Sequence, residues 1–218
     1  LTARRFSMSP IQLPSTSKIK GAIVLNGKRL TLKQTKITGT DFKLTTNGKI
    51  HLGKETLNLN TYLESADIPA VYPDLPEGLT LGNTIATGTV TGTFDNYLYD
   101  GTLQVASILY DDIPIDNLET PITLTPQYLN LPELQAEVAG GSCFVNLALD
   151  LSLEEGVGIA GEGAITEMQL ANVDVIQPEN GVFSGSAGVT FTLSGSTQQP
   201  EVLFQIDGQN SSLFPFTV

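Results

Sequence analysis

The segment SCFVNLALDLSL, residues 142–153, carries the clearest secondary-structure pattern in this chain. Its apolar side chains fall at every second position: Cys143, Val145, Leu147, Leu149, Leu151 and Leu153. Such a period of two is typical of a β-strand with one dry face and one wetter face. At about 3.3 Å per residue the strand would span roughly 40 Å, twice the usual length.

The same alternation recurs along the chain and predicts an all-β fold. It returns in the segments 57–60, 118–124, 189–193 and 202–206. Four dipeptides that suit the positive φ angles of tight hairpins punctuate the strands: Asn26-Gly27, Asn47-Gly48, Asp100-Gly101 and Gly140-Gly141. We therefore expect a long antiparallel meander of about a dozen strands. Residues 65–78 and 170–181 interrupt it, and each has room for one helical turn.

Composition excludes several classes of protein. The 218 residues carry a formal net charge of −12, which argues against nucleic acid and anionic membrane surfaces as partners. Apolar stretches are too short for a transmembrane helix. One cysteine, Cys143, and one histidine, His51, rule out an internal disulfide and a Cys/His zinc cluster. Leu1 is not an initiator Met and no signal peptide follows, so we expect a piece of a longer chain.

No motif predicts catalysis, a cofactor or a metal. His51 lacks a nucleophile context and is interpreted as a surface residue, and Cys143 as a small buried hydrophobe. The glycines of Gly88–Gly92 are not followed by a phosphate-binding helix and instead favour a bend in a sheet. Carboxylates cluster in predicted solvated loops at Asp111, Asp112, Asp116, Glu154 and Glu155. The sequence thus predicts a protein that is not an enzyme.

An internal similarity divides the chain. Residues 76–78 and 178–181 share a Pro-Glu-(Asn)-Gly sequence, and a strand rich in Gly, Thr and Ser follows each copy. We predict an irregular N-terminal segment over residues 1–17 and a single elongated β domain over residues 18–218. That domain would hold about two units of roughly 100 residues, the second starting near residues 165–181.

Four segments carry a resemblance to a known family. They are Gly88–Gly92, the Asp-Gly-Thr-Leu-Gln-Val strand at 100–105, residues 115–124, and the Leu-rich run with two glycines at 129–142. Their cadence resembles the repeat region of the AsmA-like/TamB family of envelope-spanning β-taco proteins, over about residues 18–212. The resemblance implies a taco-like, half-open elongated sheet with an apolar groove. It also implies phospholipid transport across the periplasm or plastid envelope, an inner-membrane anchor, an outer-membrane assembly partner and a role in outer-membrane protein assembly.

We expect acyl chains to lie along rungs of Leu and Val without a polar anchor, which would let a lipid slide. The predicted groove-lining residues are Leu57, Leu59, Cys143, Val145, Leu147, Leu149, Leu151, Val189, Phe191, Val202, Phe204 and Ile206. The same positions would fill the core of an ordinary sandwich. The alternative is therefore a secreted carbohydrate-binding or adhesive β-sandwich repeat module, although the chain has no Trp for sugar stacking.

Overall fold

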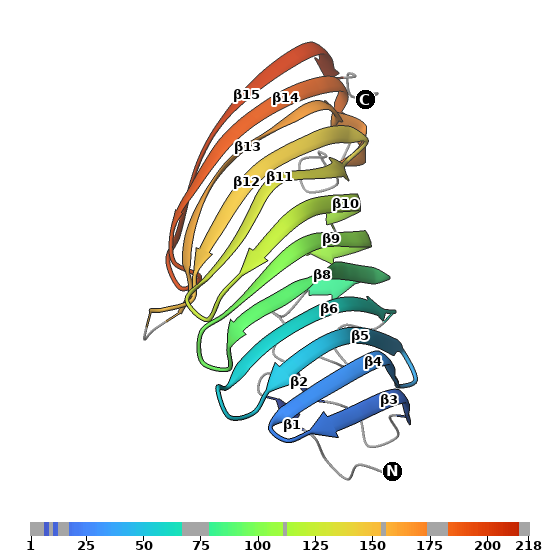
Figure 1. Ribbon diagram of the computed structural model, residues 1–218. Coiled ribbons are helices and arrows are strands. Elements are labelled where there is room, and N and C mark those ends of the chain that lie inside the picture. The colour runs from blue at the N-terminus through green and yellow to red at the C-terminus, as the bar shows by residue number, and fades with distance from the viewer. Residues whose placement is uncertain are drawn as a thin grey trace.

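The predicted antiparallel meander is confirmed. The computed structural model describes residues 7–8, 11–12, 18–66, 79–110, 113–153, 156–173 and 183–213. One thirteen-stranded antiparallel sheet dominates it, and its strands lie side by side in chain order (Figure 1). The strands on this path are β3 (Lys18–Asn26), β4 (Arg29–Thr38), β5 (Phe42–His51), β6 (Thr56–Ser65), β8 (Thr84–Thr93), β9 (Tyr97–Tyr110), β10 (Ile113–Leu124), β11 (Tyr128–Val138), β12 (Gly141–Asp150), β13 (Gly158–Gln169), β14 (Phe183–Gly195) and β15 (Pro200–Leu213). The short strand β7 (Leu79–Leu81) pairs with β9 off this path.

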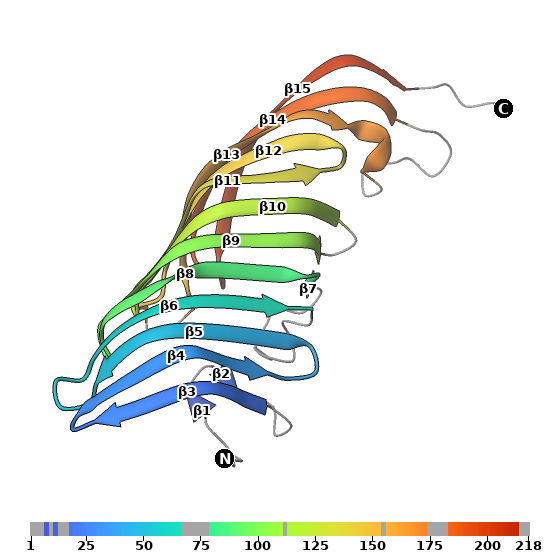
Figure 2. The same ribbon diagram turned by 45° about the vertical axis from the view of Figure 1, so that its right-hand side comes forward.

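The sheet is open and curled. Strands β3 and β15 are its two edges and do not pair with each other, so the sheet is not closed into a barrel. The long strands bend along their length, which curls the sheet lengthwise (Figures 1 and 2). With neighbouring strands about 4.8 Å apart, the path from β3 to β15 is about 50 Å long.

Beta-bulges accompany this curvature. Four strands carry an extra residue at a position with positive φ: Gln34, Asn117, Glu133 and Glu167. Gly21 and Gly185, also with positive φ, lie opposite an extra residue on the neighbouring strand. A bulge bends its strand and increases the local twist. Two bulges share a further contact, because the amide of Gln34 donates to Asn47 Oδ1 and the amide of Glu133 donates to Asn146 Oδ1. The same pair of positions thus recurs 99 residues later.

Two of the four predicted hairpin turns are wrong. Gly27 and Gly140 do lie in turns between strands, but Asn47-Gly48 lies inside β5 and Asp100-Gly101 inside β9. At Gly48 the φ of +146° and the close approach of the Asn58 carbonyl exclude a side chain. Gly101 pairs with Gly88 across two closely packed backbones. Both glycines therefore serve close approach within the sheet, which a dipeptide rule does not distinguish from a turn.

Other boundaries differ from those expected. The strand expected over residues 142–153 ends at Asp150, because the amide and hydroxyl of Ser152 both donate to Asp150 Oδ1 and turn the chain. The longest strands are β9 and β15, with 14 residues each. A single 3-10 turn, η1 (Leu170–Asn172), forms in the second interruption.

The N-terminal segment expected to be irregular contains a small hairpin. Strands β1 (Ser7–Met8) and β2 (Ile11–Gln12) pair as a separate two-stranded sheet. Residues 67–78 and 174–182 lie outside the described residues, as do Asp111, Asp112, Glu154 and Glu155. The predictions made on those four carboxylates therefore stay predictions.

The thirteen strands of the main sheet form a single layer. Extensive contacts between strands are those between hydrogen-bonded neighbours, and η1 adds a contact with β14. A filled sandwich would pack a second layer of strands against this one, and no such layer is present among the described residues.

Candidate functional site

One face of the sheet is apolar along the whole series of strands. Cross-strand partners lie on the same face, so the register traces rows of side chains across the sheet. One row runs through Leu59, Val90, Tyr99, Leu124, Leu129, Leu149 and Ile159. A second runs through Val145, Gly163, Phe191 and Phe204, and a third through Cys143, Ile165, Val189 and Ile206. We call this surface the apolar face and its opposite the polar face.

The structure brings eleven of the twelve predicted lining residues onto the apolar face. The exception is Leu151, which follows the end of β12, and its amide donates to the Gln127 carbonyl. Sequence reasoning missed the partners that join these residues into rows, such as Val90, Leu124 and Leu129. Each of those residues lies in a recognisable strand, but only the register places it in the same row as a residue four or five strands away.

The apolar face is only partly covered. Side chains such as Leu57, Leu147 and Phe191 are half-buried, and Val202, Phe204 and Ile206 on the edge strand β15 are 51–66% exposed. The described residues bury a single small cluster, Leu134, Ala136 and Cys143. On β12 the apolar-face residues are nevertheless less exposed than the intervening ones, as expected for the inner side of a curl.

The expectation of rungs without a polar group is wrong for the N-terminal half. A row of small and hydroxyl-bearing residues crosses the apolar face there: Thr35, Thr46, Thr61, Gly88 and Gly101. Thr35 is 3% exposed and Thr46 is 7% exposed, and neither hydroxyl has a hydrogen-bond partner among the described residues. A pattern of alternating apolar residues cannot find this row, because threonine is equally common on the wet face of a strand.

The two chemically distinctive side chains have structural positions. Cys143 is a free, buried thiol, and burial raises its pKa, so it is a poor nucleophile near neutral pH. His51 ends β5, and its Nδ1 accepts the amide of Lys54 at 3.2 Å in the following turn. Neither residue has a partner of the kind that a catalytic triad needs among the described residues.

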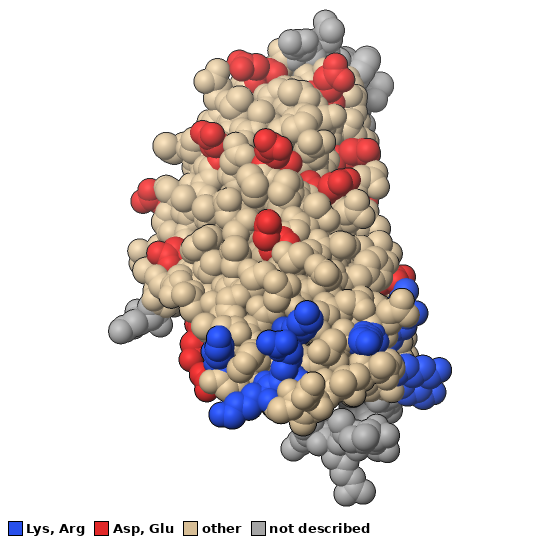
Figure 3. Space-filling model, in the orientation of Figure 1, with Lys and Arg blue, Asp and Glu red and all other residues tan. Residues whose placement is uncertain are grey.

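Charge is segregated along the polar face. All 11 Lys and Arg residues lie within positions 1–54. That region contains one of the 23 acidic residues of the chain, Asp41. Figure 3 shows the cations gathered at the end formed by β3–β5, while acidic side chains spread over the later strands. The net charge of −12 averages over these two regions and hides the basic one. The positions of Lys and Arg along the sequence were the signal that could have revealed it.

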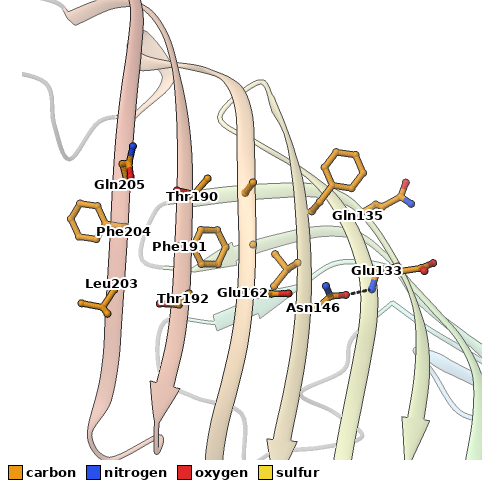
Figure 4. A pocket seen from close by; sticks show the side chains of 14 residues that line it. Glu133, Gln135, Asn146, Glu162, Thr190, Phe191, Thr192, Leu203, Phe204 and Gln205 are labelled. Carbon is orange, nitrogen blue, oxygen red and sulfur yellow. Dashed lines mark hydrogen bonds between the residues drawn. The ribbon is translucent and has the colours of Figure 1, made fainter.

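The polar face is hollowed over β11–β15 (Figure 4). The depression has a volume of about 810 Å³, and two cross-strand rows line it: Gln135, Phe144, Ala164, Thr190 and Gln205, then Asn146, Glu162, Thr192 and Leu203. Asn146 accepts the Glu133 amide at 2.9 Å beside it. The sequence placed Phe144 and Asn146 on the wet face, but it did not predict a hollow there.

The comparisons with known proteins add no relative. No protein-family model, curated protein or solved structure matches this chain. Among the described residues, no helix has the length and apolar character needed to cross a lipid bilayer. The function is therefore inferred from the two faces of the sheet.

Proposed function

We propose that this chain is a segment of an envelope-bridging protein that conducts phospholipids, with their acyl chains held against the apolar face. The observation that supports this most directly is an apolar face that continues across the strands from β3 to β15 without a second layer among the described residues. The headgroup would stay in water beyond the strand ends. This use of the face requires neither catalysis nor a cofactor.

The energy scale favours such a surface. Transfer of two acyl chains of about 16 carbons into water costs on the order of 25 kcal/mol, at about 0.8 kcal/mol for each CH₂. Rows of similar side chains repeat every 4.8 Å or so along the path, which keeps the energy of a sliding chain nearly level. The threonine row in the N-terminal half is a less apolar stretch, so we expect lipid to bind more tightly over β10–β15.

The wider setting extends this proposal through the resemblance to the AsmA-like/TamB family. The full-length protein would cross the periplasm of a diderm bacterium, or a plastid envelope. It would carry an inner-membrane anchor and meet an outer-membrane assembly factor. The cadence of residues 88–142 supports this setting.

A charged residue on the apolar face tests the proposal. We expect the purified chain to carry phospholipid in native mass spectrometry, and Leu147→Asp to reduce the bound lipid at least tenfold. The aspartate would place a carboxylate in the path of the acyl chains, at a desolvation cost of several kcal/mol. Ala148→Asp is the matched control, because Ala148 is the next residue of β12 and lies exposed on the polar face.

The outcome is decided by the difference between the two variants. Both must keep the circular dichroism spectrum and the melting temperature of a folded sheet. Lipid that is lost from Leu147→Asp and retained by Ala148→Asp supports the proposal. A wild-type chain free of lipid, or equal retention in the two variants, would refute it.

The polar hollow favours a second candidate, carbohydrate binding. Glutamine, glutamate and threonine side chains line it together with Phe144, which is 50% exposed and could stack on a sugar ring. This candidate predicts saturable chemical-shift changes at residues 133–146 on addition of an oligosaccharide, and their loss in Phe144→Ala. The β-sandwich fold predicted with this alternative disagrees with the structure, because the thirteen strands of the main sheet form one layer.

A further inference from the structure

We propose that the basic end of the polar face docks on the surface of an anionic lipid bilayer. The basic end comprises Lys18, Lys20, Lys28, Arg29, Lys33, Lys36, Lys43, Lys49 and Lys54. The inference deepens the lipid-conducting function and rests on it for its purpose, because it places one end of the apolar face at a membrane. The docking contact itself can be measured without transport.

The strand register gathers these cations on one face. Seven of them alternate with apolar-face residues along β3, β4 and β5, and Lys28 and Lys54 lie in the turns at the ends of these strands. All nine side chains are exposed. Because strands lie about 4.8 Å apart, the patch is compact. Figure 3 shows the cations gathered at this end of the molecule, with uncharged side chains between them.

The cations are not neutralised within the described part of the chain. The one ion pair there joins Lys43 Nζ to Glu64 Oε2 at 3.1 Å. Lys20 and Lys36 are direct cross-strand partners, and like charges at such positions destabilise a sheet. Eight cations therefore have no ion-pair partner among the described residues, and two of them face each other across neighbouring strands. Such a surface favours the binding of an external anion.

Apolar side chains at the same end favour a bilayer over other anions. Val24 on β3 is 47% exposed and shares the polar face with Lys18 and Lys20. Leu52 is 48% exposed and lies in the turn between β5 and β6, where its amide donates to the Lys28 carbonyl at 2.7 Å. Apolar residues bordered by Lys and Arg insert at the boundary between headgroups and acyl chains.

Nucleic acid is a poorer match for this end. Proteins that bind single strands stack bases on exposed aromatic rings. The one aromatic residue of β3–β5 is Phe42, which is 6% exposed. Tyr62 on β6 lies under Lys43, with its ring centre 5.3 Å from Nζ. A membrane needs no such platform.

The acidic remainder orients the contact. Asp41, Glu55 and Glu64 lie on or beside β5 and β6, and Glu64 already pairs with Lys43. Asp100 on β9 lies four strands from β4, roughly 20 Å away and about twice the Debye length at physiological salt. Because the nine cations outnumber these three carboxylates, the basic end keeps its attraction for an anionic surface, whereas the acidic strands beyond it are repelled by the same membrane. The molecule is expected to stand on its basic end with β15 pointing away.

Vesicle sedimentation with matched charge variants tests this inference. The full 218-residue chain is mixed with vesicles of equal parts phosphatidylglycerol and phosphatidylcholine, or of phosphatidylcholine alone. One triple variant, Lys20→Gln with Lys33→Gln and Lys36→Gln, removes three charges from the basic end. The matched control, Gln104→Glu with Gln135→Glu and Gln205→Glu, changes the net charge equally at exposed polar-face positions elsewhere.

We expect the chain to bind the anionic vesicles and not those of phosphatidylcholine alone. Added salt should weaken this binding. At roughly fivefold for each cation near an anionic surface, the lysine triple should weaken partitioning on the order of 100-fold. The glutamine triple should bind nearly as the wild type does. The lysine triple should also melt no lower than the wild type, since it relieves the repulsion between Lys20 and Lys36.

Three results would overturn the inference: equal binding to both kinds of vesicle, equal loss in the two triples, or tighter binding to a single-stranded oligonucleotide than to the anionic vesicles. Failure here is separable from failure of the proposed function. A wild-type chain that carries lipid in native mass spectrometry but ignores vesicles refutes docking alone. A chain that binds vesicles but carries no lipid refutes the conducting face alone.

Discussion

The variant Gly101→Ala is expected to lower the free energy of unfolding by about 3 kcal/mol, at the upper end of what overpacking costs. Gly101 on β9 is the direct partner of Gly88 on β8. A Cβ added to Gly101 would lie 2.7 Å from Gly88 Cα and would also overlap the Thr87 carbonyl oxygen. Both obstacles are backbone atoms that cannot rotate away, so the two strands must separate.

Urea unfolding measures this loss, and a second glycine provides the control. A Cβ added to Gly188 on β14 would meet nothing closer than the Ile165 carbonyl oxygen at 3.8 Å. Gly188→Ala should therefore be neutral or stabilise the sheet by up to about 1 kcal/mol, because it reduces the freedom of the unfolded chain. At 2–4 °C for each kcal/mol, Gly101→Ala should melt about 6–12 °C lower. Similar midpoints for the two variants would show that β8 and β9 do not approach as described.

Two threonine-to-valine substitutions are expected to change stability in opposite directions. Thr120 on β10 is 1% exposed, and its hydroxyl lies 2.8 Å from the Pro121 carbonyl and 3.0 Å from the Pro132 carbonyl. It donates where the register of β10 and β11 is irregular. Thr120→Val should cost about 2 kcal/mol, because the one hydroxyl hydrogen of this buried side chain can no longer bond a proline carbonyl.

The hydroxyl of Thr46 offers the opposite case. It is buried without a hydrogen-bond partner among the described residues, so Thr46→Val removes a desolvated polar group and should raise stability by about 1 kcal/mol. Thermal and urea unfolding of the pair would give a difference of about 3 kcal/mol between valine substitutions at two buried positions. A loss of stability in Thr46→Val would mean that this hydroxyl is hydrogen-bonded in solution.

The fold class could be predicted from the local sequence pattern, whereas the two wrong hairpin turns both came from glycine. Alternation of side chains reports strands because its period of two is a property of the backbone itself. Asn47-Gly48 and Asp100-Gly101 match hairpin turns as dipeptides, yet they lie inside β5 and β9. A glycine that permits a turn and a glycine that permits two strands to touch have the same local sequence. Only the partner strand distinguishes them.

The candidate face was predictable residue by residue and not as a surface. Val145, Leu147 and Leu149 were recognisable from β12 alone, whereas their continuity with Leu59 depends on the register of every strand between them. The bulges at Asn117 and Glu133 shift that register, and nothing in the local pattern marks them. Leu151 lies just beyond the end of β12, because the Asp150–Ser152 hydrogen bonds end the strand at Asp150.

The amino-acid sequence by itself determined that this chain forms an antiparallel β meander with one apolar and one polar side, because backbone geometry enforces both properties locally. It also contained the division between a basic N-terminal region, residues 1–54, and an acidic remainder, since the positions of Lys and Arg are read directly along the chain. Tertiary structure alone decided that no second layer of described strands covers the apolar side, that threonines cross it, and that the cations meet on one face. Each of these depends on which strands become neighbours and in what register, and those pairings join residues far apart in the chain.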